Sequence, residues 1–168
     1  MKKIIAAILF FSLYGCSNEL IIEREPKITY PEIMPEDFDF RLDYGTYSKQ
    51  VIDTFTDIVV KDLVVDNQIE TIISLSDSEM QSIYNEMVKL NVMANLEVDR
   101  DMNCHCEPES ISKWSIQMNG QTIGYHYSYC CDQSDVVEGF VELEQFIQEI
   151  VYSKESYKAL PPARGYYE

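Results

Sequence analysis

Residues 114–129, WSIQMNGQTIGYHYSY, hold two runs of alternating apolar and polar residues around the dipeptide Asn119-Gly120. Asn-Gly favours the two-residue type I′ turn of a β-hairpin, because both central residues of that turn need a positive φ. The turn sets three cross-strand pairs: Met118 with Gln121, Ile116 with Ile123, and Trp114 with Tyr125. Seven side chains then share one face: Trp114, Ile116, Met118, Ile123, Tyr125, Tyr127 and Tyr129. We predict that this face packs on a core.

Two stretches on either side of the hairpin have the apolar period of a helix. The first follows Ser76 and Glu79, which form a Ser-x-x-Glu capping box. Its apolar stripe consists of Met80, Ile83, Tyr84, Met87 and Val88. The second helix is expected from about Gly139 to Tyr152. Its stripe consists of Phe140, Leu143, Phe146, Ile147, Ile150 and Val151.

Three segments before the first helix alternate with the period of two that is typical of half-buried strands. Residues 38–44 place Phe38, Phe40, Leu42 and Tyr44 on one face. Residues 51–60 are expected to form one strand, with Ile52, Thr54, Thr56, Ile58 and Val60 in phase. Residues 69–75 are expected to form a third strand, with Ile69, Thr71, Ile73 and Leu75 in phase.

The order strand, strand, strand, helix, hairpin, helix predicts an α+β fold, in which an antiparallel β-sheet has two helices packed on one face. The length of the chain and its 46% hydrophobic residues suit one core. We therefore expect a single domain at 38–160, followed by a C-terminal tail at 161–168.

The first fifteen residues have the layout of a secretory signal peptide. Lys2 and Lys3 precede an apolar run at 4–13, which is shorter than the ~20 residues of a transmembrane helix. The segment then ends in Leu13-Tyr14-Gly15-Cys16. Leu13, Gly15 and Cys16 resemble the lipobox of bacterial lipoproteins, whereas Tyr14 stands where that family usually has a smaller residue. In general layout the chain is also similar to small uncharacterised lipoproteins of low-GC bacteria.

The resemblance implies that residues 1–15 are removed and that Cys16 becomes a lipidated N-terminus. Acyl chains contribute ~0.8 kcal/mol per buried methylene, so two or three of them would anchor the protein stably in a membrane. The implied location is the bacterial cell envelope, on the extracytoplasmic side. Residues 16–37 contain Pro26, Pro31 and Pro35 and lack a sustained period, so we expect a flexible tether there.

The charge of the chain is strongly acidic. It has 13 Lys and Arg against 29 Asp and Glu, a formal charge of −16, and losing the two lysines of residues 1–15 makes it −18. Nucleic acid is excluded as a partner, because phosphate binding needs clustered Lys and Arg. Anionic lipid would repel the domain, so the membrane contact is assigned to the lipid on Cys16. A negative surface favours a basic protein as partner.

Four cysteines remain once Cys16 is lipidated: Cys104, Cys106, Cys130 and Cys131. An even number in an oxidising compartment predicts disulfides. Bridges within each cluster would close very small rings, so we expect bridges between the clusters, in either of the two possible pairings. A zinc site is the alternative, with His105 or His126 available, although zinc sites usually have Cys-x2-Cys spacing. Free thiols are the third interpretation.

Other chemical motifs are incomplete or missing. Asp99, Asp101 and Asn103 match the start of an EF-hand loop, but Cys104 and Ser110 occupy positions where glycine and glutamate belong, so an acidic solvated loop is expected. The chain lacks the sequence motifs of serine hydrolases, P-loop NTPases, zinc proteases and dinucleotide-binding enzymes. We therefore expect no cofactor, no metal and no identifiable catalytic residue.

These observations favour a lipid-anchored binding or inhibitory module with an acidic surface and a basic partner. The alternative is a hydrolase of the cell envelope that uses Asp and Glu pairs in a site not visible in the sequence. A pocket lined by converging carboxylates with displaced pKa values would favour the enzyme.

Overall fold

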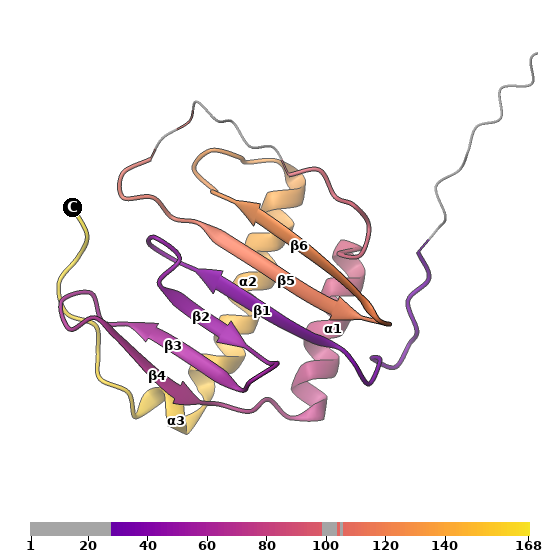
Figure 1. Ribbon diagram of the computed structural model, residues 1–168, viewed down its shortest axis with the longest axis horizontal. Helices are drawn as coiled ribbons and strands as arrows, with labels where there is room; N and C mark the ends of the chain where they lie inside the picture. Colours follow the sequence, from indigo (N-terminus) through magenta and orange to yellow (C-terminus); the bar gives the residue numbers. More distant parts are fainter. Residues whose placement is uncertain (1–27, 99–103, 105) are drawn as a thin grey trace, which may run out of the picture.

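The computed structural model describes residues 28–98, 104 and 106–168. In this part of the chain, six strands form one antiparallel sheet in the order β4-β3-β2-β1-β5-β6, with helices α1 and α2 on one face (Figure 1). The elements are β1 Asp39–Tyr44, β2 Gln50–Asp53, β3 Ile58–Asp62, β4 Gln68–Ile72, α1 Asp77–Leu90, β5 Ser112–Met118, β6 Gln121–Tyr127, α2 Asp135–Ser153 and α3 Glu155–Lys158. The expected α+β class, with two helices on one face of the sheet, is confirmed.

The hairpin of β5 and β6 has the predicted register. Met118 pairs with Gln121, Ile116 with Ile123, and Trp114 with Tyr125. Asn119 and Gly120 have φ values of 52° and 71°, as a type I′ turn requires. Five residues of the apolar face are buried, and Ile123 is partly buried. Tyr129 is 47% exposed, because β6 ends at Tyr127.

The prediction of one strand over 51–60 is wrong, because this run folds back on itself as β2 and β3. Asp57 adopts a left-handed conformation with a φ of 58°. The side chain of Asp53 accepts a hydrogen bond from the N–H of Phe55, a local bond typical of turns. Ile52 and Val59 face each other across the hairpin and are both buried. The turn at 54–57 contains no Gly, Pro or Asn, so there was no sign of a turn in the sequence and the alternating pattern predicted one continuous strand.

Strands β1 and β4 lie close to their predicted positions. The four predicted side chains of the first strand, Phe38, Phe40, Leu42 and Tyr44, are all buried. Strand β4 ends at Ile72, which is 74% exposed, and Ile73 beyond it is buried. The predicted phase of both segments is therefore correct.

Helix α1 starts at the predicted capping box, in which Ser76 and Glu79 bond to each other's backbone N–H groups. Helix α2 starts earlier than the predicted Gly139, since Ser134 is the N-cap and accepts a hydrogen bond from the N–H of Val137. Gly139 therefore lies inside the helix. The short helix α3 was not predicted.

Phe140 of α2 lies at the centre of the core between helix and sheet. Its ring centroid is 4.7 Å from that of Tyr125 and 5.7 Å from those of Trp114 and Tyr127. Such aromatic pairs contribute about 0.5–1.5 kcal/mol each beyond the burial of their area. This cluster attaches α2 to the hairpin of β5 and β6.

Residues 28–37, which we assigned to the end of the tether, lie against the domain. The Tyr30 hydroxyl accepts a hydrogen bond from the N–H of Met93, and Tyr84 donates to the carbonyl of Pro31. Asp37 bonds to the turn of the β5–β6 hairpin. The rest of the expected tether lies outside the described residues.

The C-terminal segment at 161–168 also contacts the domain. Arg164 forms a parallel β-bridge with Val64, and its guanidinium bonds to Asp66. The Tyr167 hydroxyl donates to the carboxylate of Asp62, 2.6 Å away, and accepts from Lys49. This segment therefore lies along the β3–β4 end of the sheet.

Candidate functional site

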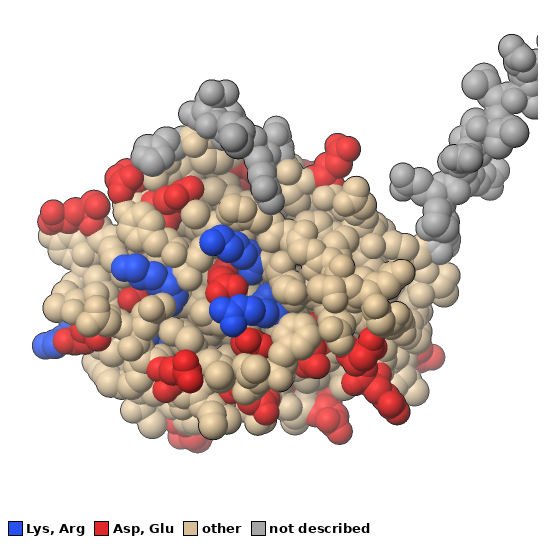
Figure 2. All heavy atoms as spheres, in the orientation of Figure 1, with Lys and Arg blue, Asp and Glu red and all other residues tan. Residues whose placement is uncertain are grey.

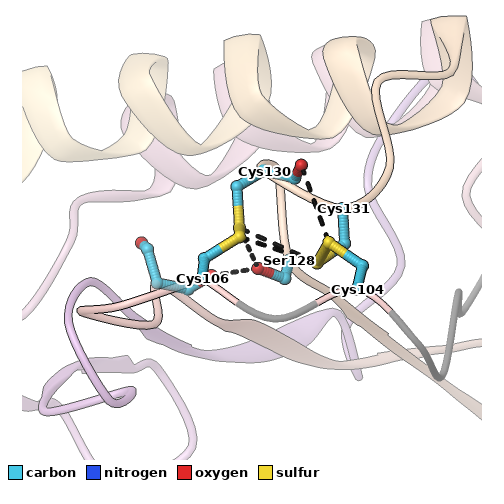
Figure 3. Close-up of a disulfide and its surroundings, with 6 residues drawn as sticks. Cys104, Cys106, Ser128, Cys130 and Cys131 are labelled. Carbon is cyan, nitrogen blue, oxygen red and sulfur yellow. Dashed lines mark hydrogen bonds between the residues drawn. A yellow bond between two sulfur atoms is a disulfide. The ribbon is translucent and has the colours of Figure 1, made fainter.

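The predicted site residues fall into two groups, within and outside the described chain. Cys16, the expected lipidation site, lies outside it, as do His105 and the EF-hand-like residues 99–103. Cys104, Cys106, Cys130 and Cys131 are described and converge at one end of the hairpin (Figure 3). We refer to them as the four-cysteine cluster.

Two disulfides join the loops on either side of the hairpin, in one of the two pairings left open by the sequence. Cys104 is bonded to Cys131 and Cys106 to Cys130, with Cα–Cα distances of 5.6 and 6.7 Å. The bridges close segments with sequence separations of 27 and 24. Closing one such segment stabilises the fold by about 3 kcal/mol in the chain-entropy model. The two segments overlap, so their effects do not add.

The sulfur atoms of the four-cysteine cluster lie within 4.8 Å of one another. Among the described residues, no other group of three or more Cys, His, Asp or Glu side chains brings its ligand atoms together closely enough to hold a metal ion. His126, the other histidine considered as a ligand, is not a member of the group. It lies on β6 opposite Lys113 of β5.

A second candidate site is a groove of about 490 Å³ between α1 and α2. We call it the helix groove. It has an apolar floor and a charged rim, and its lining residues are Glu86, Lys89, Leu90, Gly139, Glu142, Leu143 and Phe146. Lys89 forms an ion pair with Glu86, 2.6 Å away on the same helix.

Gly139 brings the two helices close together at the groove. A Cβ atom at this position would lie 2.6 Å from Cδ1 of Leu90, so a larger residue would require the Leu90 side chain to move. Glycine inside a helix costs roughly 0.5–1 kcal/mol relative to alanine. The close contact with Leu90 explains why a glycine is found inside α2. The apolar period of the helix did not predict this contact.

Most charged side chains of α1 and α2 are negative. Together α1 and α2 contain eight acids and a single lysine, and they have no arginine. Glu138, Glu142 and Glu149 are exposed on α2. The helical side of the domain therefore carries a concentrated negative charge next to the helix groove.

The face of the sheet without helices, which we call the open face, has a different distribution of charge. Lys and Arg gather near its middle, with Asp and Glu around them (Figure 2). Arg41 of β1 bonds there to the carboxylates of Asp43 and Asp53. The hydrogen bonds that Arg41 donates to Asp43 are the main cause that raises the pKa of Arg41. The charge of Arg41 is therefore balanced by two carboxylates on the open face.

Among the described carboxylates, Glu144 is the one whose pKa lies above its ordinary value. Desolvation raises the pKa of its side chain, while hydrogen bonds from Ser112, Gln148 and Tyr127 act in the opposite direction. The Ser112 hydroxyl lies 2.7 Å from one oxygen and the Gln148 amide 3.1 Å from the other. Both oxygens are therefore engaged, and Glu144 is not among the residues that line the helix groove.

Comparison of the chain with protein-family models, with curated proteins and with solved structures finds no match. Among the described residues, none of the helices combines the length and apolar character needed to cross a bilayer.

Proposed function

We propose that this protein is a lipid-anchored binding module of the bacterial cell envelope, and that the helix groove binds a basic protein partner. The observation that carries the binding role is the groove itself, in which Leu90, Leu143 and Phe146 lie beside the exposed carboxylate of Glu142. Glu86 and Lys89 at the same rim form an ion pair with each other. An apolar floor binds an apolar side chain, and carboxylates at the rim select for flanking Lys or Arg.

Charge supports the choice of a basic partner. The chain has a formal charge of −16, and the helices beside the groove hold eight acids and one lysine. Such a field speeds association with a cation and weakens as salt screens it, since the Debye length falls from about 10 Å at 0.1 M to about 3 Å at 1 M.

The anchoring part of the proposal rests on the sequence. Leu13, Gly15 and Cys16 match the lipobox after a short apolar run. The acidic domain would be repelled by anionic lipid, so a lipid on Cys16 would hold the module at the membrane while its helices face the surrounding space.

The binding role is tested with a synthetic amphipathic peptide of Lys and Leu as the probe. We expect saturable binding that weakens as salt rises. Glu142→Gln should weaken binding about 2- to 5-fold, the range for one exposed ion pair. Glu70→Gln is the matched control, because Glu70 is exposed on β4, away from the groove residues, and its substitution changes the net charge equally.

Two results would contradict the proposed groove. One is equal weakening by Glu142→Gln and Glu70→Gln, which would mean that net charge alone attracts the peptide. The other is binding that does not change with salt, which would leave the carboxylates without a role.

A further inference from the structure

We propose that the four-cysteine cluster is a reduction-dependent zinc site. In the oxidised protein its sulfurs form two disulfides, and in the reduced protein they bind one Zn²⁺ ion with tetrahedral geometry. The proposal concerns the loops at the end of the hairpin and does not depend on the binding role of the helix groove.

The spacing of the sulfur atoms is the first argument. Zinc–thiolate bonds of about 2.3 Å in a tetrahedron place neighbouring sulfurs about 3.8 Å apart. The Sγ atoms of Cys106 and Cys131 are 3.7 Å apart, and those of Cys130 and Cys131 are 3.8 Å apart. Two edges of the tetrahedron are therefore present before any metal binds. One of these edges joins the adjacent residues Cys130 and Cys131. Their spacing differs from the Cys-x2-Cys pattern that zinc sites usually have.

The remaining movement is small. After reduction, the sulfurs of each former bridge must separate to the same spacing of about 3.8 Å. The Cα atoms are 5.6 Å apart for Cys104 and Cys131 and 6.7 Å apart for Cys106 and Cys130, so side-chain rotation can supply the change.

Contacts that need no sulfur hold the two loops together, which is the second argument. The Ser128 hydroxyl donates to the carbonyl of Ser110, 2.8 Å away, and so joins the two loops directly. Ser128 lies beside the cysteines (Figure 3). The N–H groups of Cys131 and Asp132 bond to the carbonyl of Ser128 and fix the second loop. Ser110 also forms a β-bridge with Thr46. The cysteines should therefore stay close together after reduction.

Metal and reductant can both reach the cluster, because Cys130 is exposed and the other three cysteines are half-buried. The reductant is a dithiol. Each of two dithiols transfers two electrons and two protons to one disulfide and leaves as its own disulfide, so that four protein thiols form. Zn²⁺ then binds four thiolates and releases their four protons, which makes its affinity rise with pH.

The test uses the full chain in detergent with Cys16→Ser, so that the four cysteines of the cluster are the only ones present. A water-soluble phosphine reduces both disulfides and is removed without air. Co²⁺ is then added, followed by Zn²⁺. We expect one Co²⁺ per chain, with the absorption bands of tetrahedral cobalt–thiolate, displacement by Zn²⁺, and loss of reactivity of all four thiols toward a thiol reagent.

Two control samples separate the cluster from the many carboxylates. The oxidised protein and the reduced protein with alkylated thiols should both lack the cobalt–thiolate bands. Reduced Cys130→Ser should bind zinc more than about 100-fold more weakly, since removing a ligand costs more than the 10- to 100-fold typical of outer-shell changes. Trp114, the single tryptophan, reports by its fluorescence whether the hairpin stays folded.

The proposal is overturned if the reduced chain binds no metal with thiolate bands, whether or not Trp114 keeps its native fluorescence. It is also overturned if Cys130→Ser binds Zn²⁺ as tightly as the parent chain, because the metal would then be held elsewhere.

Discussion

The carboxylate of Asp37 accepts a hydrogen bond from the backbone N–H of Gly120, with 2.6 Å between Oδ2 and N. Its other oxygen accepts from the N–H of Asn119 at 2.8 Å. The residue just before β1 thus holds the tip of the β5–β6 hairpin, although 83 positions separate it from Gly120 in the sequence. These hydrogen bonds, with that of Gly120 first, hold the pKa of Asp37 below its ordinary value of 3.8.

The first prediction concerns the pH dependence of this contact. A lowered folded-state pKa means that the carboxylate stabilises the fold fully above about pH 4, and that this contribution is lost as the pH falls through 3.8 toward the lower folded pKa. Asp37→Asn should lower the melting temperature at neutral pH and should reduce the loss of stability in acid. Melting curves from about pH 2 to pH 6 measure both effects. Glu36→Gln, which changes an exposed neighbour, is the control and should keep the acid dependence of the parent.

The second prediction ranks three substitutions in the hairpin. Ile116→Ala should cost ~2–5 kcal/mol, because Ile116 is fully buried and its loss leaves a cavity. Gly120→Val should cost ~1–3 kcal/mol, because a β-branched residue is strained at a φ of 71°. Gln117→Ala, on the open face, should cost about 1 kcal/mol or less, because it loses only the long hydrogen bond of 3.4 Å from its amide to the carbonyl of Asp37. Denaturant unfolding gives the order, and a silent Ile116→Ala with a damaging Gln117→Ala would mean that the faces of the hairpin are reversed.

The third prediction concerns the cysteine pairing. Mass spectrometry of the unreduced protein should find Cys104 linked to Cys131 and Cys106 linked to Cys130. Backbone cleavage both between Cys104 and Cys106 and between Cys130 and Cys131 separates this pairing from the crossed one. Four thiols that alkylate without prior reduction would contradict the disulfides.

The fourth prediction concerns the partly buried carboxylate of Glu144. Burial raises its pKa above the ordinary 4.5, so the folded state holds the proton more tightly than the unfolded state does. The charged form therefore costs stability, and this cost develops as the pH rises from 4.5 through the folded pKa and then stays constant. Glu144→Gln should gain stability relative to the parent over that range. Urea unfolding of both proteins at several pH values tests this, and a difference that does not vary with pH would contradict it.

The fifth prediction concerns anchoring and follows from the lipobox at Leu13, Gly15 and Cys16. Cys16→Ala should release the protein from membranes into the soluble extracytoplasmic fraction, or leave its signal segment uncleaved. Membrane fractionation with detection of the precursor distinguishes these outcomes. Unchanged processing with equal membrane retention would exclude lipidation at Cys16.

Local patterns in the sequence were sufficient for several elements. The register of β5 and β6 follows from Asn119-Gly120 and the alternation around it, and the start of α1 follows from Ser76 and Glu79. In each case the deciding residues lie within a few positions of one another, so their geometry is set by φ preferences and by hydrogen bonds inside one turn. From these elements the α+β class could be inferred.

The sequence by itself therefore determined the hairpin, the face that α1 buries and the class of the fold. The tertiary structure decided which cysteine of each pair bonds to which, that Asp37 holds the hairpin turn, and that Gly139 packs against Leu90 to form the helix groove. These contacts join residues far apart in the chain. Their free energy depends on distances that exist only after the sheet and helices have packed, so no local period or propensity encodes them.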